Sequence, residues 1–198
     1  MIQGEYSMQS AKDVIKDRET VNRETNGSEQ LRMTVHASLL AALIAVGAYI
    51  SVPIGPVPIV LQNMFILLAG LLLGKRWGLA AVGVYLLAGA CGLPVFAGGT
   101  GGIGRFAGPT GGYLIGYLPA VFVVGLVSKY EKTALDILGM IVGTLIIYSV
   151  GVTWLQLITG MAFSKALAVG MYPFLIGDAL KIVAAATIAK AIRPVIRK

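Results

Sequence analysis

The clearest chemical signal in the sequence is a pair of charged residues inside an apolar segment. Asp178 and Lys181 lie three positions apart, so a helix places them on one face, where the two charges can neutralise each other. A charged side chain inside an apolar span costs about 2.5–3.5 kcal/mol on insertion scales. We expect a polar ligand site at this pair, opening outward. An ion pair that merely locks two helices together is the alternative.

Other polar side chains fall at a similar depth in their own apolar segments. Counting about 1.5 Å of rise per helical residue from each outer end places them in one layer with the Asp–Lys pair. A single aromatic residue at such a depth is more often an anchor at the membrane interface, but several helices that share the depth favour a common pocket. This layer contains Gln62, Asn63, Tyr85, Tyr113, Tyr117, Trp154 and Gln156.

The segment from Leu93 to Gly112 is rich in glycine and carries one cation, Arg105. Gly99, Gly101 and Gly104 match the pattern G-x-G-x-x-G, but no strand precedes them and no acidic residue follows about 20 positions later, which excludes a dinucleotide site. Glycine at this density lets backbone approach a ligand closely and lets the segment hinge. We expect a lid whose arginine attracts an anionic end of the ligand. A plain flexible loop is the alternative.

Several kinds of chemistry are missing from the sequence. It has no G-x-x-x-x-G-K-[ST] loop for ATP, and no histidine stands with Ser, Cys or Asp in the polar layer to form a nucleophile–base pair. With one histidine, His36, and one cysteine, Cys91, the chain forms neither an internal disulfide nor a cluster of metal ligands. We therefore predict no catalytic residues, no metal site and no cofactor, and we do not expect an enzyme.

The elements that hold these residues follow from the composition. Of 198 residues, 57% are apolar and 13% charged, whereas an ordinary soluble domain has about 25% charged residues. These figures exclude a soluble domain, a disordered chain and a disulfide scaffold, and they predict an all-α integral membrane protein. The predicted bundle has six transmembrane helices, with the glycine-rich segment as a long outer loop between the third and the fourth. The apolar stretches are roughly 33–52, 57–73, 77–91, 113–127, 135–161 and 172–191.

Basic residues are distributed unevenly between the predicted loops. With both termini inside, the inner segments hold nearly all lysines and arginines, and the outer loops hold only Arg105 and Lys165. Because lysine and arginine favour the cytoplasmic side, we predict a multi-pass protein of the cell membrane with both termini in the cytoplasm. Membrane orientation also explains the net charge of +7. The basic residues are scattered between apolar spans, so we expect no nucleic acid as a partner.

The first 32 residues differ from the rest. They are polar and lack the apolar core of a signal peptide. We predict two parts: a cytosolic polar tail over residues 1–32, or a remnant of expression, and a six-helix substrate-binding membrane domain over residues 33–198.

The first apolar stretch carries a stripe of small residues. Ala37, Ala41 and Ala45 are spaced by four positions, and small residues allow another membrane helix to approach closely. Glycine pairs with this spacing elsewhere in the chain are explained by internal packing. The alanine stripe spans three turns, which favours an external partner.

Three motifs in the sequence are similar to those of a known family. The sequence resembles the BioY family, which are the biotin-specific substrate-binding (S) components of energy-coupling factor (ECF) transporters, a type of ABC importer. The resemblance covers about residues 33–198. The motifs are Leu93–Phe96, the run GPTGGYLIG from Gly108 to Gly116 and the run PFLIGDALK from Pro173 to Lys181, with Val57-Pro58-Ile59 and Gln62 in addition. The chain departs from the family at Ile176, where proline is frequent, and in its tail.

The resemblance implies a six-helix S component that binds biotin from outside and lies in the lipid bilayer. Its partners would be a transmembrane coupling subunit, which contacts an alanine motif that maps to Ala37, Ala41 and Ala45, and two ATPase subunits. Asp178 would accept N–H groups of the ureido ring of biotin, Lys181 would donate to the ureido carbonyl, and Arg105 would lie near the carboxylate. The expected substrate-binding residues are Gln62, Tyr85, Arg105, Gly111, Gly112, Tyr113, Trp154, Asp178 and Lys181.

Three alternatives stay open. The chain could be an S component for another vitamin, or a stand-alone secondary transporter in which Asp178 is the only plausible proton carrier. A membrane enzyme is disfavoured by the missing catalytic groups.

Overall fold

The computed structural model describes residues 27–196, so most of the predicted tail lies outside the described residues. The chain divides into two units, Met1–His36 and Ala37–Lys198. In the first unit, the described residues begin a helix that runs over Gly27–Tyr49, in which the Thr34 hydroxyl donates to the Gln30 carbonyl at 2.8 Å. The second unit contains every other helix and strand of the described residues.

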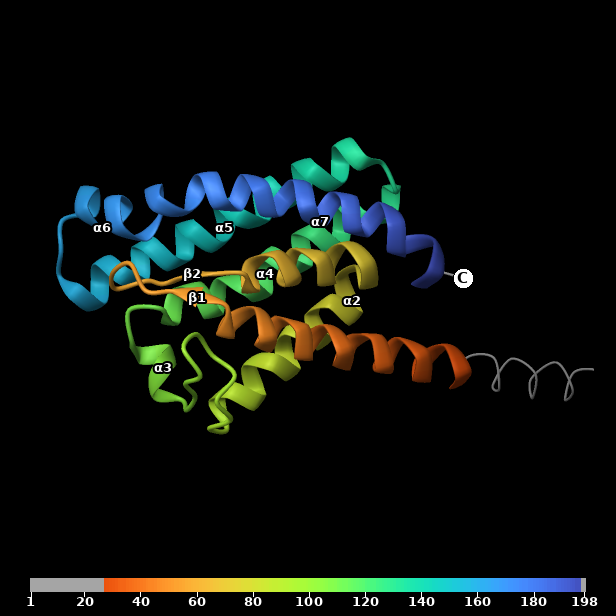
Figure 1. The fold of residues 1–198 in the computed structure, drawn as a ribbon, viewed down its shortest axis with the longest axis horizontal. Coiled ribbons are helices and arrows are strands. Elements are labelled where there is room, and N and C mark those ends of the chain that lie inside the picture. The colour runs from red at the N-terminus through yellow and green to blue at the C-terminus, as the bar shows by residue number, and fades with distance from the viewer. Residues whose placement is uncertain (1–26, 197–198) are drawn as a thin grey trace, which may run out of the picture. The chain divides into compact units, whose positions relative to one another are not determined.

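The second unit consists of helices, one small ribbon of two strands and a long irregular segment between α2 and α3 (Figure 1). Strands β1 (Ser51–Val52) and β2 (Ile59–Val60) pair antiparallel, with Ser51 opposite Val60. The helices are α2 (Gln62–Ala90), α3 (Gly104–Ala107), α4 (Gly111–Val127), α5 (Thr133–Thr159), α6 (Phe163–Gly170) and α7 (Leu175–Ile196), and two 3-10 turns, η1 (Ser128–Tyr130) and η2 (Tyr172–Phe174), precede α5 and α7.

The ribbon replaces the predicted start of the second apolar span. That span was expected to begin as a helix near Val57, but helix α2 begins only at Gln62. Pro53, Pro56 and Pro58 lack the backbone N–H that a helix or a longer strand would use. Only two residues on each side therefore pair, and the connection between them is irregular.

Helix α2 turns back on itself at Gly74. The backbone of Gly74 leaves the helical region, with φ 73° and ψ −175°, and glycine adopts such a φ at no steric cost. A Cβ on Gly78 would lie 3.2 Å from the Ala69 carbonyl oxygen, whereas nine residues of straight helix would separate the two by about 13 Å. Helix α2 is therefore two legs folded against each other, and these legs correspond to the second and third predicted spans.

Helix α4 packs between α2 and α5. Small residues make this packing close. A Cβ on Gly116 would lie 3.3 Å from the Cα of Ile147, and a Cβ on Gly143 would lie 2.9 Å from Cγ2 of Val124. The glycines at four-residue spacing in α4 and α5 thus serve packing within the chain, as the sequence predicted.

Within residues 27–196, four helices are long and apolar enough to cross a membrane: Gly27–Tyr49, Gln62–Ala90, Gly111–Tyr130 and Thr133–Thr159. Helix α7 is not among them and carries Asp178, Lys181, Lys190 and Arg193. Large apolar side chains on the outside of the helices, such as Leu87 and Leu157, are exposed, as they are on a surface that faces lipid. The predicted helical membrane fold is confirmed at this level.

A second buried ion pair, at the end of α7, joins three helical segments. Nη2 of Arg193, near the end of α7, lies 2.9 Å from Oδ2 of Asp136 in the first turn of α5. The same nitrogen donates to the carbonyl of Leu71 in the first leg of α2 at 3.5 Å. From the sequence, Arg193 was counted with the loop residues, and this pair was not predicted.

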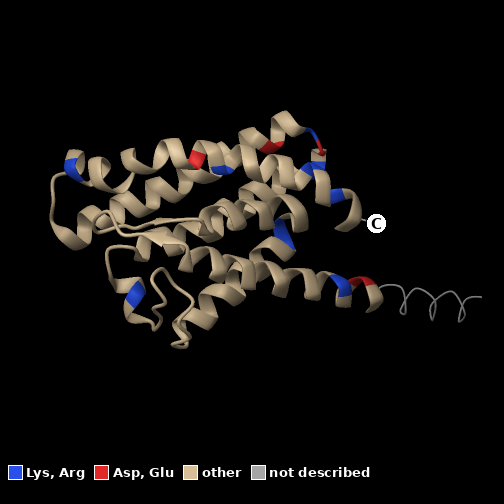
Figure 2. Cartoon of the chain, in the orientation of Figure 1, with Lys and Arg blue, Asp and Glu red and all other residues tan. Residues whose placement is uncertain are grey.

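The basic residues of the second unit gather at the end that carries Arg193 and the C-terminus (Figure 2). At the other end lie α3, with Arg105, and α6, with Lys165. Asp178 and Lys181 of α7 lie between these two ends.

Candidate ligand-binding site

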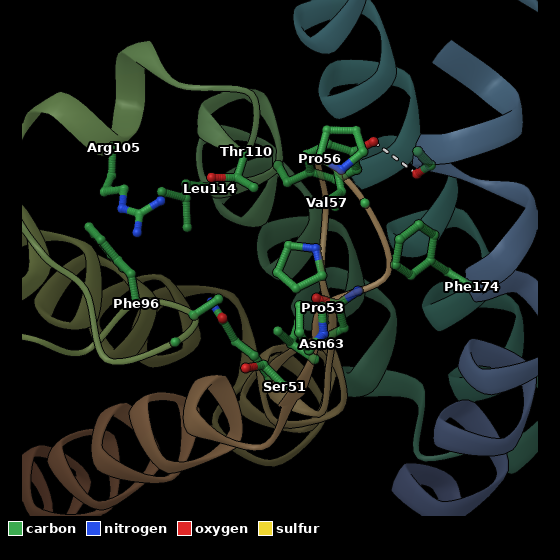
Figure 3. Close-up of a pocket in the computed structure, with 18 of the residues that line it drawn as sticks. Ser51, Pro53, Pro56, Val57, Asn63, Phe96, Arg105, Thr110, Leu114 and Phe174 are labelled. Carbon is green, nitrogen blue, oxygen red and sulfur yellow. Dashed lines mark hydrogen bonds between the residues drawn. The ribbon is translucent and has the colours of Figure 1, made fainter. Parts of the chain in front are cut away.

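A cavity of about 350 Å³ lies at the end of the second unit that carries α3 and α6. Its wall combines the β1–β2 connection, the glycine-rich segment, the starts of α2 and α4, and side chains of α5 and α7. Arg105 and Phe96 lie on one side of the connection that contains Pro53 and Pro56, and Phe174 lies on the other side (Figure 3).

Four of the predicted binding residues line this cavity: Gln62, Arg105, Tyr113 and Lys181. The other five predicted residues do not line it. Tyr85 and Asp178 contact residues that do, whereas Gly111, Gly112 and Trp154 pack around the start of α4.

Asp178 holds two residues of the cavity wall at once. Its Oδ1 accepts a hydrogen bond from Lys181 Nζ at 2.8 Å, and its Oδ2 accepts one from the Tyr148 hydroxyl at 2.5 Å. Asp178 is only 4% exposed, so the ammonium of Lys181 balances a carboxylate that water hardly reaches. Because charge-assisted hydrogen bonds are strong and directional, Asp178 fixes the positions of Lys181 and Tyr148.

Two further tyrosine hydroxyls on the wall donate hydrogen bonds to the protein. Tyr113 donates to the Gly170 carbonyl at 2.8 Å, and Tyr117 donates to Oδ1 of Asn63 at 3.1 Å. These bonds join α4 to the end of α6 and to the start of α2. Each hydroxyl oxygen keeps lone pairs that can accept a hydrogen bond from a ligand.

Tyr85 supports the wall from behind. Nε2 of Gln62 donates to the Tyr85 hydroxyl at 2.9 Å. The Tyr85 ring packs edge-on against Phe96, with centroids 5.6 Å apart, and Phe96 packs in the same way against Phe106 at 5.7 Å. One buried tyrosine therefore positions a polar and an aromatic residue of the cavity.

Backbone hydrogen bonds fold the glycine-rich segment over the cavity. Phe96 and Thr100 exchange two of them, at 2.8 and 3.3 Å, and the Gly102 N–H donates to the Gly89 carbonyl near the end of α2 at 2.7 Å. The Phe96 ring fills the space that a Cβ on Gly89 would need. The segment predicted as a lid is thus a folded cover that is fastened to α2.

Arg105 extends from α3 toward the cavity (Figure 3). Its side chain is exposed, and none of the acidic residues between 27 and 196 forms an ion pair with it. A guanidinium without such a partner at the edge of a cavity suits a carboxylate, which it binds with two parallel hydrogen bonds.

The glycines before Tyr113 act through packing. Nε1 of Trp154 donates to the Gly108 carbonyl at 3.0 Å. A Cβ on Gly112 would clash with the Cβ of Trp154, and a Cβ on Gly111 would clash with the Phe106 carbonyl. Only glycine permits these close approaches, which fix the start of α4 and thereby the position of Tyr113.

Part of the wall was not predicted from the sequence. The proline-rich connection and Phe174 had no expected binding role, yet both line the cavity. Three prolines at the start of an apolar stretch are a signal of irregular backbone that could have revealed the connection. Tyr148 gave no such signal, because it lies in the middle of a long apolar stretch.

Two of the three alanines in the stripe of the first helix are buried in the isolated chain. Ala37 and Ala41 are 6% and 7% exposed, and Ala45 is partly exposed, whereas Ser38 and Ala42 are exposed. Successive helical residues point about 100° apart, so the small residues that remain open lie on the neighbouring face. Ala37 and Ala41 are therefore covered in the isolated chain, and their contact with an external helix stays a prediction.

The whole second unit and part of the first match one family of proteins. The family model described as the BioY family matches residues 18–198. This chain belongs to the BioY family. The match begins within the segment predicted as a tail. The resemblance that the sequence motifs indicated is confirmed.

Curated relatives and a solved structure agree with the BioY assignment. A biotin transporter BioY of Thermotoga maritima is 45% identical over 160 residues, which cover 80% of this chain and 94% of that protein. A biotin transporter BioY of Rhizobium etli is 36% identical over 172 residues, which cover 81% and 91%. The crystal structure of an S-component for biotin from an ECF-type ABC transporter matches with a TM-score of 0.79 and 31% identity, covering 84% of this chain and 93% of that one.

Proposed function

We propose that this chain binds biotin in the cavity and serves as the S component of an ECF transporter. The observation that carries the proposal is the cavity wall of a BioY-family chain, in which Lys181 is held from behind by Asp178, and Arg105 forms no ion pair with an acidic residue between 27 and 196. Biotin has a neutral cyclic urea at one end, a carboxylate at the other, and an apolar ring and chain between them. The wall offers a partner for each part.

The urea end is assigned to α7. Lys181 Nζ has three N–H groups, of which one bonds to Asp178, so the others can donate to the urea carbonyl. Asp178 does not line the cavity. Its proposed part in binding is to hold the ammonium of Lys181 in place.

The carboxylate end is assigned to Arg105. Phe96 and Leu114 lie beside Arg105 in the wall (Figure 3) and can contact the apolar chain. Because Arg105 is exposed, water and salt screen its attraction to the carboxylate. We therefore expect Arg105 to contribute less affinity than the buried pair on α7.

Six membrane crossings with cytoplasmic termini form part of the proposal. The two legs of α2 would cross separately, and α7 would be the sixth crossing. The supporting observations are the basic residues at the end opposite the cavity (Figure 2) and the turn at Gly74. Lysine and arginine favour the cytoplasmic side, so the cavity would open outward.

A transmembrane coupling subunit and two ATPase subunits are the proposed partners. The sequence has no ATP-binding loop, so energy for import has to come from other chains. Ser38 and Ala42, four positions apart and exposed, give the first helix a face of small residues on which a helix of the coupling subunit can pack.

Calorimetric titration of the purified chain with biotin and with desthiobiotin tests the proposal. Both ligands carry the urea and the carboxylate, so both should bind saturably at one site, with biotin tighter because it also has the thioether ring. Absence of biotin binding, with binding of another vitamin, would refute the assignment. Uptake in cells should require the ATPase subunits, and uptake driven by an ion gradient without them would identify a secondary transporter instead.

A further inference from the structure

Tyr148 is a polar residue of the cavity wall to which the proposed function gives no task. It lies on α5, lines the cavity and is buried. Its hydroxyl lies 2.5 Å from Oδ2 of Asp178. The other oxygen of this carboxylate, Oδ1, accepts the hydrogen bond from Lys181. Tyr148 and Lys181 therefore reach the cavity from two helices and share one carboxylate behind it.

The hydrogen of the Tyr148 hydroxyl is already used. An ionised carboxylate can only accept, so in this contact the tyrosine donates and Asp178 accepts. What remains for a ligand is the lone pairs of the Tyr148 oxygen. Lys181 is the opposite case, because an ammonium has donors and no acceptor. The shared carboxylate thus sets an acceptor and a donor side by side.

The spacing of this acceptor and donor matches one kind of ligand group. Two groups that bond to the two oxygens of one carboxylate lie about 4–7 Å apart. The partners of a C=O and a neighbouring N–H on a five-membered cyclic urea lie about 3–6 Å apart, depending on the direction from which the donor approaches the carbonyl oxygen. One urea edge can therefore reach both residues at once.

We infer that Tyr148 is a specificity-determining residue that accepts the N–H of a cyclic urea whose carbonyl is bound by Lys181. This inference rests on the proposed function and places on Tyr148 the acceptor role that the sequence suggested for Asp178. Asp178 is then a positioning residue, because it holds the donor and orients the acceptor. A ligand that presents an acceptor or a methyl group in place of this N–H leaves a buried oxygen without a partner and is rejected.

The experiment measures three ligands on two proteins. Biotin and its two N-methyl derivatives, one for each urea nitrogen, are titrated into the purified chain and into the Tyr148→Phe variant. We expect Tyr148→Phe to weaken biotin binding about tenfold or more. On the unchanged chain, one of the two methylations should weaken binding by a similar or larger factor, and on Tyr148→Phe that penalty should shrink at least fivefold.

Several outcomes would overturn the inference. It fails if Tyr148→Phe binds biotin as the unchanged chain does, or if both methylation penalties are the same on the two proteins, since a purely structural tyrosine would weaken all ligands equally. If the variant does not fold, titration of the unchanged chain still tests the inference. Affinities for both N-methyl derivatives within about threefold of that for biotin would show that no urea N–H is recognised. Failure of the unchanged chain to bind biotin at all would instead refute the proposed function.

Tyr172→Phe is the matched control. Tyr172 lies in η2, is 56% exposed and does not line the cavity. This substitution removes the same hydroxyl and should change neither the biotin affinity nor the two methylation penalties. A loss like that of Tyr148→Phe would show that the effect is not specific to the cavity hydroxyl, and the inference would be withdrawn.

Discussion

Arg193 of α7 and Asp136 of α5 form a buried ion pair with 2.9 Å between Nη2 and Oδ2, at the end of the second unit away from the cavity. Both charges also suit the helices that carry them. The carboxylate lies in the first turn of α5 and the guanidinium in the last turn of α7, where the helix dipoles favour a negative and a positive charge respectively. The pair thus joins the helices that carry Tyr148 and Lys181 at a distance from the ligand.

Replacing Arg193 with Gln should destabilise the chain without changing biotin affinity. Loss of one partner leaves a buried charge uncompensated, which costs about 3–5 kcal/mol. Thermal unfolding of the purified variant should occur clearly below that of the unchanged chain. Lys190→Gln, at an exposed position on the same helix, is the control and should unfold at the original temperature. Equal unfolding temperatures for the two variants would contradict a stabilising role of the pair.

Replacing Asp178 with Asn should weaken biotin binding at least tenfold. The substitution removes the charge that holds Lys181 and Tyr148, and hydrogen bonds to charged groups contribute about 1.5–3 kcal/mol each. Titration calorimetry measures the affinity. Asp136→Asn is the matched control, because it neutralises the other buried carboxylate away from the cavity and should leave affinity intact while lowering stability. Unchanged biotin binding by folded Asp178→Asn would remove Asp178 from the site.

Replacing Arg105 with Ala should weaken biotin more than biotin methyl ester. The ester keeps the urea, ring and chain but lacks the negative charge, so only the acid benefits from the guanidinium. We expect a loss of a few-fold for biotin, since the exposed charge is screened, and almost none for the ester. Lys165→Ala removes another cation at the same end of the chain and should affect neither ligand. If Arg105→Ala weakens acid and ester equally, the arginine shapes the glycine-rich cover and does not recognise charge.

Replacing Ala42 with Trp should block assembly with the coupling subunit and leave biotin binding intact. Ala42 is exposed, and a large side chain there would keep a partner helix away from the small-residue face. Co-purification with the coupling subunit and ATP-driven uptake should fail together. Ala41→Trp, one position earlier, should instead destabilise the isolated chain, because Ala41 is buried and the core would be overpacked. Normal assembly of Ala42→Trp would place the interface on another surface.

The helical membrane fold could be predicted from the sequence because the signal is long and repeated. An apolar stretch of about 20 residues with few charges is typical of a membrane-spanning helix. The ribbon of β1 and β2 was missed because its residues are apolar like those of a span, and only the prolines distinguish them. The pair of Arg193 and Asp136 was missed because the two residues are 57 positions apart in a count along the chain, and no local pattern predicts which distant charges meet.

The residues of the cavity, too, could be predicted from the sequence only in part. Gln62, Arg105, Tyr113 and Lys181, which line the cavity, were predicted as binding residues because a polar or charged residue in apolar surroundings is conspicuous. Tyr148 was overlooked, since its importance comes from a contact with Asp178 on another helix. Small-residue spacing predicts a close helix contact at Ala37 and Ala41 but does not identify the partner, and it does not predict that both alanines are buried in the isolated chain.

The hydrogen bond from Trp154 to the Gly108 carbonyl gives the chain an optical reporter of its own cover. The sequence contains two tryptophans, and Trp154 is the one whose indole N–H bonds to the end of the glycine-rich segment, at 3.0 Å. Indole emission shifts to longer wavelength when the ring becomes more hydrated. Ligand entry that moves this segment will therefore change the emission of Trp154, and the rate of opening can be followed in unlabelled protein by rapid mixing. The second tryptophan, Trp77, lies just after the Gly74 turn and supplies a constant background.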